Sequence, residues 1–374
     1  MDIIKRFIDF YVPVESCTFR CHYCYITHHR KFDNKLPVLK YSAEQVRAGL
    51  SKERMGGPCL INICGGGETL LPPEVIGYIR ALLEEGHYVM VVTNASVTKR
   101  FEEMAQFPPE LMKRLFFKFS YHYMQLKERG LLDRFVSNVK MMSDAGASYT
   151  IEATPSDELI PYIDEMKEFS IKHFGAVNHV TVGRNEAAKG NLPILTKLPH
   201  HEYEQIWSTF HSEFFEYKYS IFNKKRTEFC YAGDWSFVLN VGTGMMQQCY
   251  CSYYRQNILD DPSKPIKFLA VGNNCNQYHC YNGHAFLCLG DIPEHKAPTY
   301  ATIRNRVCVD GSEWLKPEMK SFMSTRLKES NKEYSKGKKF RVNSLIRILK
   351  ALSILDCYKM KFIWRWRYYK KRLS

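Results

Sequence analysis

The chain has 374 residues, of which 45% are hydrophobic, so it is long enough for two or three domains with substantial cores. No run of 18 or more apolar residues occurs, which argues against a membrane-spanning helix, and the first residues, MDIIKRFIDFYV, lack the cleavage site of a secretory signal. The net charge of +14 lies mostly in residues 336–374, where thirteen Lys and Arg and one acid give +12. The other 40 basic and 38 acidic residues leave a nearly neutral body, so we expect no nucleic-acid partner.

Apolar, β-rich stretches alternate with helical patterns over the first 200 residues. The predicted strands span residues 7–14, 59–64, 88–92, 114–119, 148–153 and 177–182. The predicted helices span residues 42–55, behind a capping box, then 74–85, 135–145 and 157–173. Strands that alternate with helices predict a parallel sheet, and nearly continuous apolar strands fit burial on both faces.

Three cysteines, Cys17, Cys21 and Cys24, follow the first strand with the spacing C-x3-C-x2-C. Three thiolates this close can bind three corners of one iron–sulfur cube and leave its fourth iron open. A structural zinc site would close with a fourth ligand, for which His28 and His29 are candidates, so zinc remains the alternative. Because the chain has thirteen cysteines and no secretory signal, we expect thiols or metal ligands in a reducing, cytoplasmic compartment.

The pattern C-x3-C-x-aromatic-C, with Tyr23 as the aromatic residue, resembles the signature of radical S-adenosylmethionine (SAM) enzymes. The resemblance covers residues 1–190 well and residues 225–290 more weakly. It implies a 4Fe–4S cluster whose open iron binds the amino and carboxylate groups of SAM. The reduced cluster then cleaves SAM to a 5′-deoxyadenosyl radical that takes a hydrogen atom from a substrate. It also implies an external electron donor of the flavodoxin or ferredoxin type.

Polar and glycine residues follow the predicted strands repeatedly. In βα barrels the chemistry gathers at the C-terminal ends of the strands, so these residues predict one shared active-site mouth. The resemblance implies an α/β fold, a partial six-stranded TIM-like barrel over residues 1–200, open on one side. The residues that it assigns to SAM binding are Tyr23, Gly66, Gly67, Glu68, Asn94, Ser120 and Arg184. For the asparagine, the serine and the arginine, a capping or surface role is the ordinary alternative. His122 is a further candidate that would face the substrate.

A second cysteine-rich region, residues 201–310, is expected to form a smaller domain that begins with a helix over residues 202–217. Cys230 and Cys249 enclose C-x13-G-x4-C, which is similar to the opening of the SPASM or Twitch extension of some radical SAM enzymes. There a hairpin, here around Gly242-Thr243-Gly244, carries ligands of an auxiliary 4Fe–4S cluster. The later cysteines depart from the full SPASM spacing, so one auxiliary cluster is expected rather than two. The chosen ligands are Cys230, Cys249, Cys275 and Cys280, with Cys251 or Cys288 as replacements and a zinc ribbon or plain buried thiols as alternatives.

Residues 311–374 are expected to form a polar linker and a basic amphipathic tail. Leu345, Ile348, Leu349, Leu352 and Leu355 fall at helical spacing, and aromatic residues between 362 and 369 interleave with Lys and Arg. Such a helix suits an anionic membrane surface, which predicts a peripheral location at the inner face of the membrane. A helix packed on the body is the alternative.

Two substrate classes fit these features. The tail favours a substrate held at the membrane, such as a lipid-linked glycan precursor, which would undergo oxidation or epimerisation. A peptide or protein maturase is the second reading, and it loses weight because the barrel begins at once, without an N-terminal recognition domain. A zinc-binding scaffold or RNA-binding protein is the non-enzyme alternative.

Overall fold

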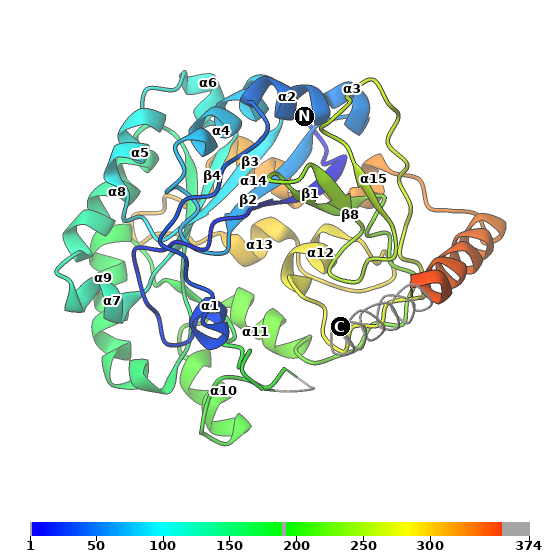
Figure 1. Ribbon diagram of the computed structural model, residues 1–374. Coiled ribbons are helices and arrows are strands. Elements are labelled where there is room, and N and C mark those ends of the chain that lie inside the picture. Colours follow the sequence, from blue (N-terminus) through cyan, green and yellow to red (C-terminus); the bar gives the residue numbers. More distant parts are fainter. Residues whose placement is uncertain (1, 189–191, 354–374) are drawn as a thin grey trace, which may run out of the picture.

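Figure 1 shows the computed structural model, which describes residues 2–188 and 192–353. Within these residues nine strands form one sheet in the order β6-β5-β4-β3-β2-β1-β7-β8-β9. The strands are β1 (Arg6–Val12), β2 (Cys59–Gly65), β3 (Tyr88–Thr93), β4 (Leu115–Ser120), β5 (Ser148–Ala153), β6 (His179–Val180), β7 (Ser236–Asn240), β8 (Met245–Gln247) and β9 (Arg255–Asn257). Strands β1 to β6 are parallel neighbours in chain order, which confirms the predicted α/β fold with a partial TIM-like barrel.

Helices follow the parallel strands and cover one face of the sheet, as α5 and α8 do in Figure 1. The helices of the barrel half are α1 (Tyr25–His29), α2 (Ala43–Gly49), α3 (Lys52–Met55), α4 (Glu74–Glu84), α5 (Thr98–Met104), α6 (Pro109–Met112), α7 (Tyr123–Glu128), α8 (Leu132–Asp144), the 3-10 helix η1 (Asp157–Tyr162) and α9 (Ile163–Phe174). Those of the second half are α10 (His200–Ser208), α11 (Glu213–Ser220), α12 (Gly283–Leu289), α13 (Tyr300–Arg304), α14 (Pro317–Ser324) and α15 (Leu327–Ser330).

Two of the predicted helices are each divided into two helices, and a serine side chain caps the second helix of each pair. The predicted helix over residues 42–55 ends at Gly49, because the Ser51 hydroxyl accepts a bond from the Arg54 amide and begins α3. A helix expected over residues 202–217 likewise divides into α10 and α11. There His211 takes a left-handed conformation (φ 44°), and Ser212 caps the second helix.

Alternation along the strands gives the sheet two different faces. Residues such as Ile61, Val91 and Phe117 pack against the outer helices. The residues between them, such as Phe7, Leu60 and Met90, pack against α12, α13 and α14, which lie on the opposite side of the sheet. The chain beyond residue 283 therefore fills the base of the barrel interior.

The same inner face turns polar toward the carboxyl ends of the strands. Asp9 of β1 pairs in register with Asn62 of β2, and Lys118 of β4 pairs with Thr150 of β5. Since residues two apart on a strand share a face, these polar side chains lie one step above the apolar base. The barrel interior thus has an apolar base and a polar wall nearer the carboxyl ends of the strands.

The hairpin predicted around Gly242-Thr243-Gly244 is present as antiparallel β7 and β8. Its first strand pairs in parallel with β1, in a register that sets Asp9 beside Val238. The cysteine-rich region therefore extends the barrel sheet on the β1 side.

Residues 311–335, expected to begin a polar linker, instead pack on the body through α14 and α15. Phe322 of α14 stacks on Tyr88 with the ring centroids 3.5 Å apart. Residues 336–353 are helical. Leu345 and Leu349 of the expected apolar stripe pack on the body, whereas Ile348 and Leu352 are exposed. Leu355 and the aromatic stretch 362–369 lie outside the described residues, and no helix in the described part is long and apolar enough to cross a bilayer.

Candidate active site

The loop between β1 and α1 brings the three N-terminal cysteines to the carboxyl end of the sheet. Cys21 is buried, Cys17 and Cys24 are half-buried, and none of the three is in a disulfide. They line a cavity of about 190 Å³ together with residues that follow β2, β3 and β4. These residues include Gly66, Gly67, Glu68, Asn94, Ser120 and His122. The sequence-predicted residues from four strands therefore share one cavity.

The glycines after β2 pack directly on the cysteine loop. The Gly67 amide donates to the Val14 carbonyl (2.6 Å), and the Glu68 amide donates to the Ser16 carbonyl (2.9 Å). A Cβ atom on Gly67 would overlap the backbone of Ser16, and one on Gly66 would lie 2.9 Å from the Val14 carbonyl oxygen. Both positions therefore need glycine so that β2 and the cysteine loop can approach each other.

Glu68 joins the end of β2 to the end of β3. Its buried carboxylate accepts bonds from the Thr93 hydroxyl (2.6 Å), the Asn94 amide (2.8 Å) and the Leu70 amide (3.1 Å). Both oxygens are thus engaged within the protein, so Glu68 acts on the cavity by fixing Asn94.

Asn94 in turn contacts the cysteine loop. Its side-chain nitrogen donates to the Thr18 hydroxyl (2.9 Å) and lies 3.7 Å from Cys17 Sγ. A hydrogen-bonded path therefore runs from Glu68 through Asn94 to the first cysteine.

Burial controls ionisation in this cavity. It raises the pKa of Cys17 to about 11 and of Cys21 to about 12, so the thiols without metal are protonated at neutral pH. Burial also lowers the pKa of His122 to about 4, so its imidazole is neutral, and its Nδ1 shares a hydrogen bond of 2.7 Å with the Tyr23 hydroxyl. Tyr23 and His122 thereby pack together beside the cysteines.

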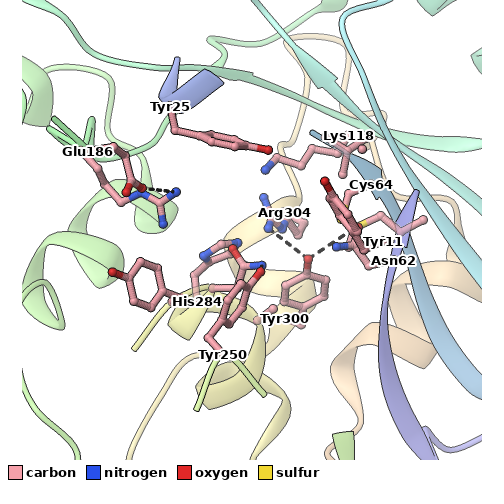
Figure 2. A pocket seen from close by; sticks show the side chains of 17 residues that line it. Tyr11, Tyr25, Asn62, Cys64, Lys118, Glu186, Tyr250, His284, Tyr300 and Arg304 are labelled. Carbon is pink, nitrogen blue, oxygen red and sulfur yellow. Dashed lines mark hydrogen bonds and ion pairs between the residues drawn. The ribbon is translucent and has the colours of Figure 1, made fainter. Parts of the chain in front are cut away.

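A larger cavity, of about 430 Å³, adjoins the first one inside the barrel (Figure 2). Tyr25, Gly65 and Val92 line both cavities. The remaining wall comes from the polar inner face of the sheet and from α12 and α13. Its side chains include Cys64, Lys118, Tyr250, His284 and Arg304.

Arg184 lies in this larger cavity and does not line the one with the N-terminal cysteines. Its guanidinium pairs with Glu186 at 3.1 Å and lies over the ring of Tyr281. Two of the SAM-binding candidates, Arg184 and Tyr23, therefore do not line the cysteine cavity, although Tyr23 bonds to His122 of its wall.

A third cavity, of about 40 Å³, collects cysteines of the second region. Five thiols line it: Cys230, Cys249, Cys251, Cys275 and Cys280. Tyr250 and Tyr281 line both this cavity and the larger one. Cys288 lies instead in α12, fully buried in an apolar core. The four chosen ligands and Cys251 thus converge, whereas Cys288 does not.

The comparisons with known proteins bear on the first cavity. The family model described as "Radical SAM superfamily" matches residues 11–151, which include the cysteine loop and the ends of β2, β3 and β4. This part of the chain therefore matches the radical SAM superfamily. No curated protein matches the sequence.

Among solved structures, the chain is similar to SuiB of Streptococcus suis, at 16% identity and a TM-score of 0.46, over 70% of this chain and 64% of SuiB. A SuiB structure with the precursor peptide SuiA matches at 14% identity and a TM-score of 0.43, with the same coverage. The structure of anSMEcpe with bound AdoMet matches at 11% identity and a TM-score of 0.43, over 68% of this chain and 76% of that one.

The radical SAM family implies SAM and a 4Fe–4S cluster, and the first cavity fits both groups. Its donor set is three thiols, which leaves one iron of a cube without a protein ligand. Its wall includes the half-buried backbone of Gly66 and Gly67, which carry no side chains of their own. No three His, Cys, Asp or Glu side chains of the described residues are placed to bind one metal ion together. The thiolates of a cube bind separate irons and so need not meet at a point.

Several polar residues of the radical SAM domain were missed by the sequence interpretation. Asp9 accepts bonds from Asn62 (2.7 Å), Tyr250 (3.1 Å) and Asn282 (3.1 Å). Lys118 and Glu152 lie on neighbouring strands and form an ion pair. The available signal was a charged residue inside each otherwise apolar strand: Asp9 in RFIDFYV, Lys118 in LFFKFS and Glu152 in SYTIEA.

Proposed function

We propose that this protein is a radical SAM enzyme in which Cys17, Cys21 and Cys24 hold a 4Fe–4S cluster. The adjoining wall, from Gly66 to Glu68 with Asn94 and Ser120, would bind SAM. When bound, the cluster and SAM together supply a 5′-deoxyadenosyl radical that removes a hydrogen atom from a substrate. The observation that carries the proposal is that the three cysteines share one cavity with the glycine wall after β2.

The chain's own residues position the groups. Backbone bonds from Gly67 and Glu68 fix the cysteine loop against β2, and Asn94 holds its Thr18. Tyr25 stands between the two cavities and donates to the Gly66 carbonyl at 3.3 Å. A substrate in the larger cavity would therefore meet the SAM site across Tyr25, Gly65 and Val92, within a pocket of the barrel that limits access of water.

The test is SAM cleavage by the anaerobically reconstituted protein with dithionite. The triple variant Cys17→Ala, Cys21→Ala, Cys24→Ala is expected to form no 5′-deoxyadenosine, because no cluster can present SAM. The matched control Cys288→Ala, whose thiol lines neither cysteine cavity, is expected to cleave SAM as the wild type does. Undiminished cleavage by the triple variant would falsify the assignment.

A second cluster at the third cavity is part of the same proposal. Cys230, Cys249, Cys275 and Cys280 supply four thiolates, the usual set for a 4Fe–4S cluster, and Cys251 is the alternative fourth ligand. Tyr250 and Tyr281 separate this cavity from the larger one, so an electron could pass between a substrate and that cluster over one layer of side chains.

Membrane contact through the C-terminal tail, with a lipid-linked glycan precursor as substrate, is a further part of the proposal. Support comes from the basic composition of residues 336–374 and from exposed Ile348 and Leu352. The full chain is expected to sediment with anionic liposomes, and a chain ending at about residue 336 is expected to remain in the supernatant. Equal sedimentation of the two chains would contradict the proposed membrane contact of the tail.

A further inference from the structure

The larger cavity sets two basic side chains, half-buried Lys118 and buried Arg304, against one carboxylate at its polar wall. Lys118 Nζ lies 3.1 Å from Glu152 Oε2, and Arg304 Nη1 bonds to Glu152 Oε1. Arg304 is fully buried and Glu152 is 5% exposed. When Lys118 is protonated, two cations share this single carboxylate, and the group then carries an excess positive charge in a place of low polarity.

Two nitrogens of the same wall have no hydrogen-bond partner among the described residues. They are Arg304 Nε and His284 Nδ1, and both side chains are more than nine-tenths buried and line the cavity. Figure 2 shows Lys118, Arg304 and His284 around the same space, although they come from β4, α13 and α12. Buried polar groups are normally paired, so unpaired nitrogens at a cavity wall indicate a missing partner with acceptor atoms.

The other bases nearby show the same excess of positive charge. Burial, and then Lys218, Lys118 and Arg184, hold the pKa of His284 well below its ordinary value. Burial, and then Arg184 and Lys118, do the same to the pKa of Lys218. Each protonated base lowers the pKa of its basic neighbours, and a bound anion would raise those pKa values again.

We propose that the substrate carries an anionic oxygen group, a carboxylate or a phosphate, that binds at Lys118, Arg304 and His284. This inference rests on the proposed function for the identity of the cavity as the substrate site. None of these three residues lines the cysteine cavity. A substrate whose anionic group binds to them would therefore extend from this anion site toward Tyr25 and Gly65, which line both cavities. Arg184, which is already paired with Glu186, is the less available cation.

The test measures the chemical labelling of the Lys118 amine. Burial lowers the pKa of Lys118 to about 7, so at pH 8 its amine is largely neutral and can condense with an aldehyde. The imine that forms, with release of water, is reduced by added cyanoborohydride to a stable amine. The site is then located by peptide mass spectrometry on the anaerobically reconstituted full chain.

Pyridoxal 5′-phosphate and pyridoxal are the matched probes, since they differ in the phosphate group. We expect the phosphate-bearing probe to label Lys118 about tenfold faster, because charge-assisted hydrogen bonds hold it there. Pyridoxal also closes to an internal hemiacetal that lowers its free aldehyde, so the rate ratio of the two probes at Lys118 is compared with the ratio at exposed Lys113 in the same digest. Equal rate ratios at Lys118 and Lys113 would overturn the inference.

Competition then identifies the anion. Protection of Lys118 by inorganic phosphate alone indicates a phosphate-bearing substrate, and protection by acetate alone indicates a carboxylate. The preference itself is expected to fall toward that of Lys113 in Arg304→Gln. Because this variant could unfold by leaving Glu152 half-paired, His284→Leu is the second variant, with a smaller expected loss. If Arg304→Gln and His284→Leu both fold and both keep the preference of Lys118 for pyridoxal 5′-phosphate, the inference is also overturned.

This outcome is separate from SAM cleavage. A protein that cleaves SAM but shows no preference loses the anion site and keeps the proposed function. A protein that shows the preference but forms no 5′-deoxyadenosine keeps an anion site and loses the proposed function.

Discussion

Lys118 stands in the middle of β4 with apolar residues on both sides in the sequence, LFFKFS. A charged side chain within a buried strand is unfavourable unless partners surround it. Glu152, Arg304, Arg184, Asp9 and Cys64 are the charged and titratable groups that act on it, and the ion pair with Glu152 is its direct contact. Its position on the polar inner face is thus tied to the cavity rather than to the stability of the sheet.

The ionisation of Lys118 predicts a dependence of stability on pH. Burial and then Arg304 lower its pKa to about 7 in the folded protein, against 10.5 for an ordinary lysine. Between pH 7 and pH 10.5 the unfolded chain therefore binds more protons than the folded one at this site. In that window the free energy of unfolding rises with pH, and below pH 7 this contribution no longer changes.

Comparison with Lys118→Met removes the contribution of groups that lie away from Lys118, because those groups titrate alike in both proteins. We expect the wild type to gain stability relative to the variant as the pH rises from 7 to 9.5, by at most about 1.4 kcal/mol per pH unit. Thermal unfolding at several pH values measures it. A difference between the two proteins that stays constant over this range would contradict the assigned pKa.

At the scale of elements, the cysteine loop depends on how closely the end of β2 approaches it. Gly67 has backbone of Ser16 where its side chain would lie, and the two chains bond there directly. Alanine at this position must therefore move the loop that carries the three thiols. The position tests whether the contact of β2 with the loop is needed to hold the cluster.

We expect Gly67→Ala to lose most of the iron bound by the N-terminal cysteines and most SAM cleavage. The control is Gly77→Ala in α4, where the new Cβ would make an ordinary contact of 3.5 Å with Ala43. Because alanine is the better helix former, this control should be neutral or more stable by about 0.5–1 kcal/mol. Iron content after anaerobic reconstitution, with circular dichroism to confirm folding, distinguishes the two. Full iron in Gly67→Ala would show that the loop tolerates displacement.

The elements also show what the sequence can and cannot predict. The parallel strands and the site at their ends follow from local signals: apolar runs, the cysteine spacing and the glycines of residues 65–67. The pairing of β7 with β1 joins residues more than 220 positions apart, and no local pattern encodes it. For the same reason the sequence does not predict that Arg304 and His284 line the cavity. Their helices enter the barrel only through long-range packing.

At the scale of the whole molecule, the three cavities form a series. The first and second share Tyr25, Gly65 and Val92, and the second and third share Tyr250 and Tyr281. The first and third cavities share no lining residue, and the larger cavity lies between them. The two sets of thiols should therefore bind iron independently of each other.

This independence predicts the iron content of matched variants. The wild type is expected to hold about eight irons per chain, and the triple variant at Cys17, Cys21 and Cys24 about four. The variant Cys230→Ala, Cys249→Ala is likewise expected to hold about four, because a cluster with two thiolates missing is not retained. It should still cleave SAM, since its changes lie beyond the larger cavity from the SAM site.

Single variants then choose between the rival ligands of the third cavity. Loss of about four irons in Cys275→Ala with full iron in Cys251→Ala supports the chosen set, and the reverse result makes Cys251 the ligand. Cys288→Ala should keep all its iron, because that thiol lies in an apolar core and not on the cavity wall. Electron paramagnetic resonance of the reduced proteins provides a second measure, since each cluster gives its own signal. A wild type with about four irons, all lost in the triple variant at the N-terminal cysteines, would leave the second set of thiols without a cluster.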